Sequence, residues 1–360
     1  MSSNNPKHVL VSVLDWGLGH ATRCIPVINC LLVNNCKVSV AGNGSSLELL
    51  KKEFPQLTFH ELSSYKVTYP SHAFFFLHLL FQVPYIVNTI RKEHKQIEKL
   101  IIENQIDAVI SDNRYGCYSD QVPSVLITHQ LNIQLPVSLS WSKCIIDYAN
   151  YRLIKKFNAC WVPDFSSSGF TGKLAETQKL KVRFIGMLSR FSFKEVVQER
   201  DLVVGLVSGP EPQREIFEKL LIKEFKKLNQ PGIIIRGLPH LIVKEIKDGN
   251  ISLLAHATAQ ELERIISKAS IIISRSGYST IMDLQALGKK RVIFVPTPGQ
   301  TEQEYLAGEL ERRNIAYTQR QAQFSLAEAI QQSKDYSGFD PTLHHTNLLN
   351  EAVQDLLHRI

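Results

Sequence analysis

The chain has 360 residues, which is enough for two domains of ordinary size. Its composition, 44% hydrophobic and 21% charged, is that of a soluble protein with a buried core. The net charge of +7 favours anionic partners, but there is no arginine-rich arm and no alternation of basic and aromatic residues, so we expect no nucleic-acid partner.

The compartment is predicted from the cysteines and from the lack of targeting signals. The six cysteines form no Cys-x-x-Cys pair and no cluster with zinc spacing, so we expect reduced thiols in a cytoplasmic protein. The N-terminal residues do not have the pattern of a secretory signal. The most apolar stretch, residues 73–87, contains His78, Gln82 and Pro84, and it is too short and too interrupted to span about 30 Å of hydrocarbon.

Short apolar runs alternate with helical patterns along the whole chain. The first half predicts helices at 21–33 and 45–54, a long helical segment before 107, and strands at 8–14, 37–42, 107–112, 124–130 and 181–186. The second half predicts a helix at 211–227 and strands at 202–210, 232–237, 251–256, 270–277 and 291–299. β-branched runs separated by helices indicate parallel sheets that are buried on both faces.

The predicted fold class is therefore α/β, with two doubly wound, Rossmann-like domains facing a cleft. We expect the first domain to cover 1–186 and the second 187–344, with a C-terminal helix at 345–360 that packs back on the first. In open parallel sheets, ligands bind beyond the carboxyl ends of the strands. The loops that follow the strands thus hold the candidate site residues.

The loop after the first strand reads "DWGLGHATR". Gly17 and Gly19 allow another molecule to approach the backbone closely, and the helix start that follows favours an anion or a developing charge. The loop is not a dinucleotide fingerprint, because Thr22 stands at the third glycine position, and it is not a P-loop. His20 can accept a proton at cellular pH; the alternative is a histidine that only caps the turn.

Two consecutive strand–loop–helix units stand out in the second half. The first strand ends in "SRSG" and continues into a helix whose Ser279 and Thr280 suit a phosphate, with Asp283 within reach of a ribose diol. The next strand ends in "PTPG", and a run of acids and an amide at 302–304 opens the following helix. For the acids in both helices the alternative is a first turn that favours negative charge through the helix dipole alone.

With these segments the chain resembles glycosyltransferases of the two-domain GT-B type, and most closely the MurG-like family 28, which transfers a sugar from a UDP-sugar. "WGLGHATR" resembles that family's N-terminal glycine-rich loop, and "SRSGYSTIMD" resembles its Ser-Gly segment followed by an acid that binds ribose. "GQTEQEYLA" is similar to the glutamine-rich helix start that touches the donor sugar, and "GMLSR" to the segment between the domains whose arginine faces the pyrophosphate. The resemblance implies an acceptor-side first domain and a donor-binding second domain.

The donor-binding residues that the resemblance implies lie in five segments: Gly17, Gly19, Arg190, Ser208, Gly209, Arg275, Ser276, Gly277, Ser279, Thr280, Asp283, Gln303 and Glu304. Two segments depart from the family pattern. Ser208-Gly209-Pro210 replaces a Gly-Gly-Ser loop, and Glu304 replaces the second of two donor-facing glutamines. Both departures bear on the identity of the sugar.

The sequence also suggests a mechanism. There is no Asp-x-Asp motif, which argues against a divalent ion holding the diphosphate, so we expect no metal and no other cofactor. The charge of the leaving UDP would be met by loop N–H groups with Arg190 and Arg275. His20 would take the proton of an acceptor hydroxyl, while Asp112 or His129 would orient the acceptor or share that role. A single displacement at the anomeric carbon predicts inversion.

Several alternatives stay open at this point. A nucleotide-sugar hydrolase of pseudaminic acid synthesis has a similar Gly-x-Gly-His loop, a nucleotide-sugar epimerase has a similar architecture, and a protein without catalytic activity could bind the nucleotide-sugar on the same fold. The apolar residues Phe74–Phe81, followed by basic residues at 91, 92, 95 and 99, could press on the inner face of a membrane near a lipid-linked acceptor. The alternative for this segment is a helix pair that packs into the core.

Overall fold

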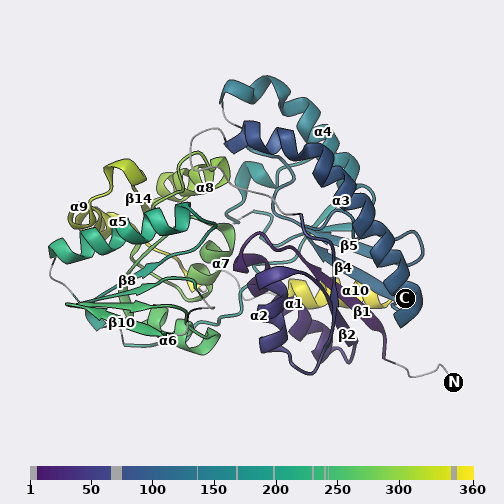
Figure 1. The fold of residues 1–360 in the computed structure, drawn as a ribbon, viewed down its shortest axis with the longest axis horizontal. Helices are drawn as coiled ribbons and strands as arrows, with labels where there is room; N and C mark the ends of the chain where they lie inside the picture. The colour runs from purple at the N-terminus through teal and green to yellow at the C-terminus, as the bar shows by residue number, and fades with distance from the viewer. Residues whose placement is uncertain are drawn as a thin grey trace. The chain divides into compact units, whose positions relative to one another are not determined.

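The computed structural model describes residues 6–65, 75–135, 137–167, 169–197, 199–228, 231–238, 241, 243–341 and 347–360. The described chain divides into two compact units, one formed by 6–65, 76–188 and 347–360 and the other by the residues from 189 to 341. Each unit is built on a seven-stranded sheet with helices around it, so the prediction of a two-part α/β fold with parallel sheets is confirmed (Figure 1).

The sheet of the first unit has the strand order β3-β2-β1-β4-β5-β6-β7, and every neighbouring pair is parallel. Its strands are β1 (His8–Val13), β2 (Lys37–Gly42), β3 (Thr58–Glu61), β4 (Ala108–Asp112), β5 (Ser124–Ile127), β6 (Ala159–Val162) and β7 (Val182–Phe184). Its α-helices are α1 (Leu18–Val33), α2 (Gly44–Glu53), α3 (Phe75–Asn104), α4 (Lys143–Ile154) and α10 (Leu348–Leu357). The central strands β1 and β4 are buried along their whole length, as their Val- and Ile-rich sequences require.

The C-terminal helix α10 belongs to the first unit, where it packs against α1 (Figure 1). Asn34, at the end of α1, donates a hydrogen bond from Nδ2 to Oδ1 of Asn350 over 2.8 Å. Arg183 of β7 forms an ion pair with Asp355 of α10. The last residues of the chain therefore complete the domain in which the first residues lie.

The sheet of the second unit has the order β10-β11-β9-β8-β12-β13-β14, in which only β10 runs antiparallel to its neighbour. Its strands are β8 (Glu199–Leu206), β9 (Gly232–Ile235), β10 (Glu245–Asp248), β11 (Ile251–Leu254), β12 (Ala269–Ser274), β13 (Val292–Phe294) and β14 (Tyr317–Thr318). Its α-helices are α5 (Gln213–Leu228), α6 (Ala259–Lys268), α7 (Tyr278–Ala286), α8 (Thr301–Arg312) and α9 (Leu326–Gln332).

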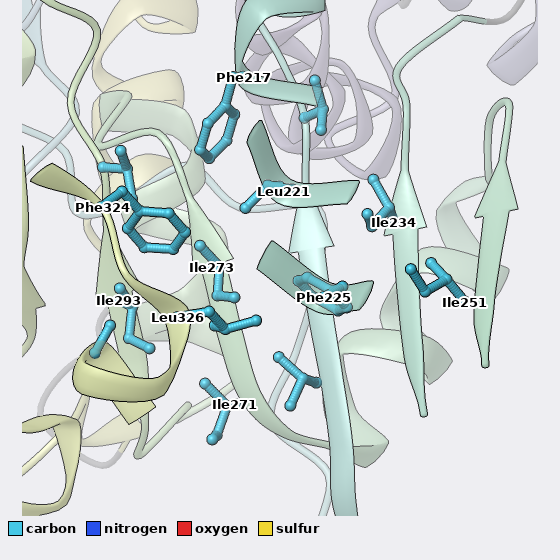
Figure 2. Packing of buried hydrophobic residues seen from close by; sticks show 14 of the residues in the cluster. Phe217, Leu221, Phe225, Ile234, Ile251, Ile271, Ile273, Ile293, Phe324 and Leu326 are labelled. Carbon is cyan, nitrogen blue, oxygen red and sulfur yellow. The ribbon is translucent and has the colours of Figure 1, made fainter. Parts of the chain in front are cut away.

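The core of the second unit forms where α5 packs on the sheet. Phe217, Leu221 and Phe225 follow one another at intervals of four along α5, which places them on one face of the helix. Figure 2 shows this row of α5 packed in the same cluster as Ile273 of β12 and Ile234 of β9. The spacing of the apolar residues in the sequence thus fixes which face of the helix is buried.

The structure differs from the prediction mainly in short or exposed elements. Strands β3, β6, β10 and β14 were not predicted; β3 and β10 are largely exposed, so they lack the apolar runs by which buried strands are found. Helix α1 begins at Leu18, three residues before the predicted start, which places His20 inside its first turn. No helix in the described part of the chain is long and apolar enough to cross a membrane. In the stretch Phe74–Phe81, Phe74 and the side chains of 75–81 lie outside the described residues.

Candidate active site

Three neighbouring strands bring the predicted catalytic residues of the first unit together. Strands β1, β4 and β5 are adjacent and parallel, so their carboxyl ends lie at the same edge of the sheet. Asp112 is the last residue of β4, His129 lies two residues beyond β5, and His20 is in the first turn of the helix that follows β1. Their separation in the sequence, 92 residues from His20 to Asp112, hides this proximity.

Gly17 directs the chain from β1 into α1. It is the N-cap of the helix, with φ 98° and ψ 159°, a conformation that is essentially restricted to glycine. A β-carbon at this position would meet nothing within 4 Å, so the requirement for glycine comes from the backbone alone. The predicted role of Gly17 as a turn residue therefore has a physical basis in its dihedral angles.

His20 and Asp112 form a hydrogen-bonded pair. Nδ1 of His20 lies 2.7 Å from Oδ2 of Asp112, and Nε of Arg23 donates to Oδ1 of the same carboxylate over 2.6 Å. Nη2 of Arg23 also lies 2.9 Å from Nδ1 of His20. Because the nearer neighbour of Nδ1 is a charged acceptor, we assign the proton of the neutral ring to Nδ1, which leaves the lone pair of Nε2 to accept a proton.

Burial and the neighbouring charges together determine the protonation states of His20 and Asp112. The side chain of His20 is 15% exposed and that of Asp112 is 1% exposed. Burial and the nearby Arg23 cation lower the pKa of His20 below 6.5, although Asp112 opposes this shift. Burial of Asp112 favours its neutral form, but Arg23 and His20 outweigh it and lower the pKa of the carboxyl. At neutral pH the pair therefore holds a neutral imidazole beside a carboxylate.

Arg23 is a site residue that the sequence analysis did not identify. Besides its bonds to Asp112, its Nη1 lies 3.2 Å from Nδ1 of His129, so it joins the two histidines to one carboxylate. His129 does not reach His20 directly through any of these bonds. The signal in the sequence was the position of Arg23, three residues after His20 and thus on the same face of α1.

A buried ion pair supports the loop that carries His20. Arg114 and Glu93 are both fully buried, and Nε of Arg114 donates to the Glu93 carboxylate. The guanidinium also donates to the carbonyl of Val13 over 3.0 Å, to Asn43 Oδ1 over 2.7 Å and to the carbonyl of Ser63 over 2.6 Å. The loop after β4 thus contributes a structural arginine that ties α3 to the end of β1.

In the second unit the loops after β8, β12 and β13 also meet at one edge, since these strands are neighbours in the order β8-β12-β13. Helix α7 follows β12 and has Gly277 as its N-cap, without a side-chain capping bond. Ser208 and Gly209 are exposed after β8, and Gly209 has a φ of 103° with open space around it. Ser279 and Thr280 are half-buried in the first turn of α7.

Asp283 interacts with the segment that was predicted to face the pyrophosphate. Oγ of Ser189 donates a hydrogen bond to Oδ1 of Asp283 over 2.6 Å. Burial raises the pKa of Asp283 to about 6, and the Arg190 cation and the Ser189 bond partly oppose the shift. Ser189 was not among the predicted residues, although it lies next to Arg190 in the "GMLSR" motif.

Two predicted donor residues mainly shape their own loop. Oε1 of Gln303 accepts a hydrogen bond from the backbone N–H of Thr297, and Oε1 of Glu304 accepts one from Gly299. Ser276 is buried, and its Oγ donates to the carbonyl of Gln303 over 2.7 Å. These contacts hold the start of α8 against the loops after β12 and β13, which orders the edge where the donor was expected.

Arg275 departs from its predicted role as a direct partner of the diphosphate. Its side chain is 1% exposed, and its Nη atoms donate to backbone carbonyls and to one glutamine side chain. The guanidinium is therefore occupied inside the protein. Within the described residues, no group of three or more His, Cys, Asp or Glu side chains could hold a metal ion.

Known proteins with similar sequences and folds agree with this architecture. Residues 244–357 match the glycosyltransferase family 28 C-terminal domain. A protein of Methanosarcina mazei named as an uncharacterized glycosyltransferase is 23% identical over 328 residues, which are 84% of this chain and 83% of the relative.

Two crystal structures share the fold over nearly the whole chain. MurG of Acinetobacter baumannii has a TM-score of 0.60 and 14% identity, with 99% of this chain and 100% of that chain covered. The glycotransferase of kitacinnamycin has a TM-score of 0.64 and 14% identity, with 99% and 96% covered. Together these matches indicate a glycosyltransferase: its fold is that of two-domain GT-B enzymes, and its residues 244–357 are similar to the family 28 C-terminal domain.

Proposed function

We propose that this glycosyltransferase transfers a sugar from a UDP-sugar to an acceptor hydroxyl by a single inverting displacement, without a metal ion. The observation that carries the proposal is the His20–Asp112 pair, a neutral imidazole held by a buried carboxylate at the ligand-binding edge of a parallel sheet. The choice of a UDP-sugar rests on the resemblance of residues 274–283 to the family 28 donor segment and on the family match at 244–357.

The acceptor is activated by His20 in this proposal. Nε2 takes the proton of the acceptor hydroxyl as its oxygen forms a bond to the anomeric carbon. The bond between that carbon and the diphosphate breaks, its electron pair leaves with UDP, and the proton stays on the imidazole. Asp112 stabilises the imidazolium that results, and such a general base contributes about 10²–10⁴-fold to the rate. Attack from the side opposite the leaving group inverts the anomeric configuration.

The donor is held by the second unit. The N-terminus of α7 at Gly277 offers backbone N–H groups and a positive dipole end to the diphosphate, with Ser279 and Thr280 beside it. Asp283 accepts hydrogen bonds from the ribose diol, and Arg190, which lies close enough to lower the pKa of Asp283, adds positive charge. Each well-placed group that meets the charge of the leaving UDP is worth about 3–4 kcal/mol.

The location is proposed to be cytoplasmic, with peripheral contact at the inner face of a membrane. All six cysteines are free thiols, which suits a reducing compartment. Trp141, just before α4, and Ile145 and Tyr148 on α4 are 75%, 66% and 60% exposed. They repeat at intervals of four and three, and the exposed Arg152 and Lys155 continue the row, as in a helix that lies on an anionic lipid surface.

A screen of UDP-, GDP-, dTDP- and CMP-sugars tests the proposal, with thermal shift and nucleotide release measured together in the presence of EDTA. We expect one UDP-sugar to bind with little release until an acceptor is supplied, and EDTA to leave both readouts unchanged. Rapid release in buffer alone would favour a hydrolase in which water replaces the acceptor. Binding without turnover for any acceptor would favour a binding protein, and a requirement for added metal would contradict the metal-independent mechanism.

A further inference from the structure

Arg275 is the centre of a hydrogen-bond network beneath the loops of the second unit. Nη1 donates to the carbonyls of Val295 and Pro296 over 2.8 and 3.1 Å. Nη2 donates to Oε1 of Gln321 over 2.5 Å and to the carbonyl of Gln213 over 3.3 Å. One side chain thus connects the loop after β13, the start of α5 and the segment after β14.

On the side of the apolar core, the Arg275 guanidinium packs against an aromatic ring. The Arg275 guanidinium carbon lies 4.1 Å from the centroid of the Phe217 ring. Figure 2 shows Phe217 beyond Ile273, toward the carboxyl end of β12, so the guanidinium is stacked at the top of the apolar core. The cation is therefore enclosed by carbonyls, an amide and a ring.

This buried cation differs from the other buried arginines. In the first unit, Arg23 is paired with Asp112 and Arg114 with Glu93. Among the described residues, no ion pair includes Arg275, and burial alone lowers its pKa to about 9. Buried charges in proteins are normally paired or coordinated, because an isolated charge is expensive to remove from water. Arg275 thus holds a charge without an acidic partner in the part of the chain that the structure describes.

The residue that carries this charge lies next to the residues of the proposed donor site in the chain. Arg275 directly follows Ser274, the last residue of β12, and precedes Gly277, the N-cap of α7. Two of its bonds reach the loop that leads to α8. We propose that Arg275 is a positioning residue whose unmatched buried charge favours a nucleoside diphosphate at this edge of the sheet without touching it. The inference rests on the proposed function for the identity of the ligand.

The expected effect follows from Coulomb's law. At a separation of about 10 Å and an effective dielectric constant of about 20, one unit charge changes the affinity for an anion on the order of tenfold. A nucleoside without phosphates should not respond to the charge. The ratio between the affinities for UDP and uridine therefore separates the electrostatic role of Arg275 from a role in shaping the loops.

The test uses the full-length protein and calorimetric titration with UDP and with uridine. We expect Arg275→Gln to lose about tenfold in UDP affinity while its uridine affinity stays within twofold of wild type. Arg275→Lys keeps the charge but loses the planar guanidinium with its several donors. It should keep the UDP-to-uridine ratio within about threefold of the wild-type ratio. Arg291→Gln is the matched control, since this arginine bonds the Ile330 carbonyl and the Ser333 hydroxyl at the opposite end of β13 and should leave the ratio unchanged.

Equal losses for UDP and uridine in Arg275→Gln would overturn the proposal, because they would indicate a purely structural residue. An unchanged affinity for UDP would also overturn it. If Arg275→Gln does not fold, Arg275→Lys decides, and a UDP-to-uridine ratio that falls about tenfold below that of wild type would contradict the charge effect. A wild-type protein that prefers UDP to uridine but never transfers a sugar would contradict the proposed function while the Arg275 comparison still stands.

Discussion

In the proposed mechanism His20 and Asp112 act together: the carboxylate of Asp112 lies 2.7 Å from Nδ1 of His20, and Nε2 then accepts the proton. Since burial and Arg23 lower the pKa of His20, the base should be neutral throughout the physiological range. We expect kcat/KM to rise with pH through a pKa below 6.5 and to be level near pH 7. Asp112→Asn should reduce kcat by about 10²–10³-fold, within the range of general-base catalysis, and should move the acid limb of a measured pH profile. A profile with no acid limb would contradict this assignment.

The buried carboxylate of Asp283 should lower the stability of the folded protein while it favours the binding of UDP. Burial raises the pKa of Asp283 to about 6, above its value in the unfolded chain. The raised pKa therefore contributes to the stability of the folded protein at low pH, and this contribution is lost as the pH rises through 6 and the carboxyl ionises. Asp283→Asn keeps an oxygen for Ser189 but removes the charge. The variant should therefore be more stable than wild type by up to about 3 kcal/mol at pH 8, and by roughly half of that at pH 5.

Urea unfolding of wild type and Asp283→Asn at the two pH values measures this difference. The variant should also bind UDP about tenfold more weakly, since a charged acceptor for the ribose hydroxyls is lost. Equal free energies of unfolding for the two proteins at pH 8 would show that the charge on Asp283 does not destabilise the folded state.

The sequence predicted which residues stand at the ends of strands, but not how their side chains are paired. His20, Asp112 and His129 could be named because each follows an apolar run. The position of Arg23 between them depends on the strand order, which brings β1, β4 and β5 together. Arg275 was expected to face a ligand, and only the packing around Phe217 shows that it points into the protein.

At the level of elements, the connection from β1 into α1 depends on Gly17. Its backbone conformation is restricted to glycine, so Gly17→Ala should lower the free energy of unfolding by about 1–3 kcal/mol even though there is room for the methyl group. Gly308→Ala is the control. Gly308 is exposed inside α8 and also has open space, so alanine there should stabilise the protein by about 0.5–1 kcal/mol. Thermal unfolding of both variants checks the signs, and a stabilising Gly17→Ala would contradict the account of this turn.

Elements were predictable where burial makes their pattern simple. Strands β1 and β4 are fully buried and β12 is nearly so; all three are rich in Val or Ile, and they appear in the sequence close to their observed bounds. β10 and β3 were missed because their side chains are mostly exposed and their sequences are polar. The start of α1 was misplaced because Leu18 and Gly19 read as loop residues, whereas Gly17 begins the helix as its N-cap.

For the whole molecule, the division of the chain into two α/β units could be expected from the repeated strand–helix pattern. The sequence did not indicate the exposed apolar row on α4 that we propose for membrane contact, because the exposure of a side chain cannot be read from composition. The stretch that it suggested instead, Phe74–Phe81, lies outside the residues whose side chains are described.

The α4 surface predicts binding to anionic membranes. Full-length protein should float with vesicles that contain phosphatidylglycerol, and Ile145→Ser with Tyr148→Ser should lose most of this binding while keeping the same UDP affinity. Val33→Ser is a suitable control, because Val33 is also exposed but lies on α1. Flotation that is unchanged in the double variant would contradict the assignment, and so would the absence of any wild-type protein in the lipid fraction.

The central claim is that His20 is the base of a transferase, and the turnover of His20→Ala tests it most directly. Donor affinity has to be measured on the same sample, so that a loss of turnover is not a loss of binding. The account predicts a fall in kcat of about 10²–10⁴-fold with a UDP dissociation constant within twofold of wild type. Turnover close to that of wild type, with intact donor binding, would contradict it.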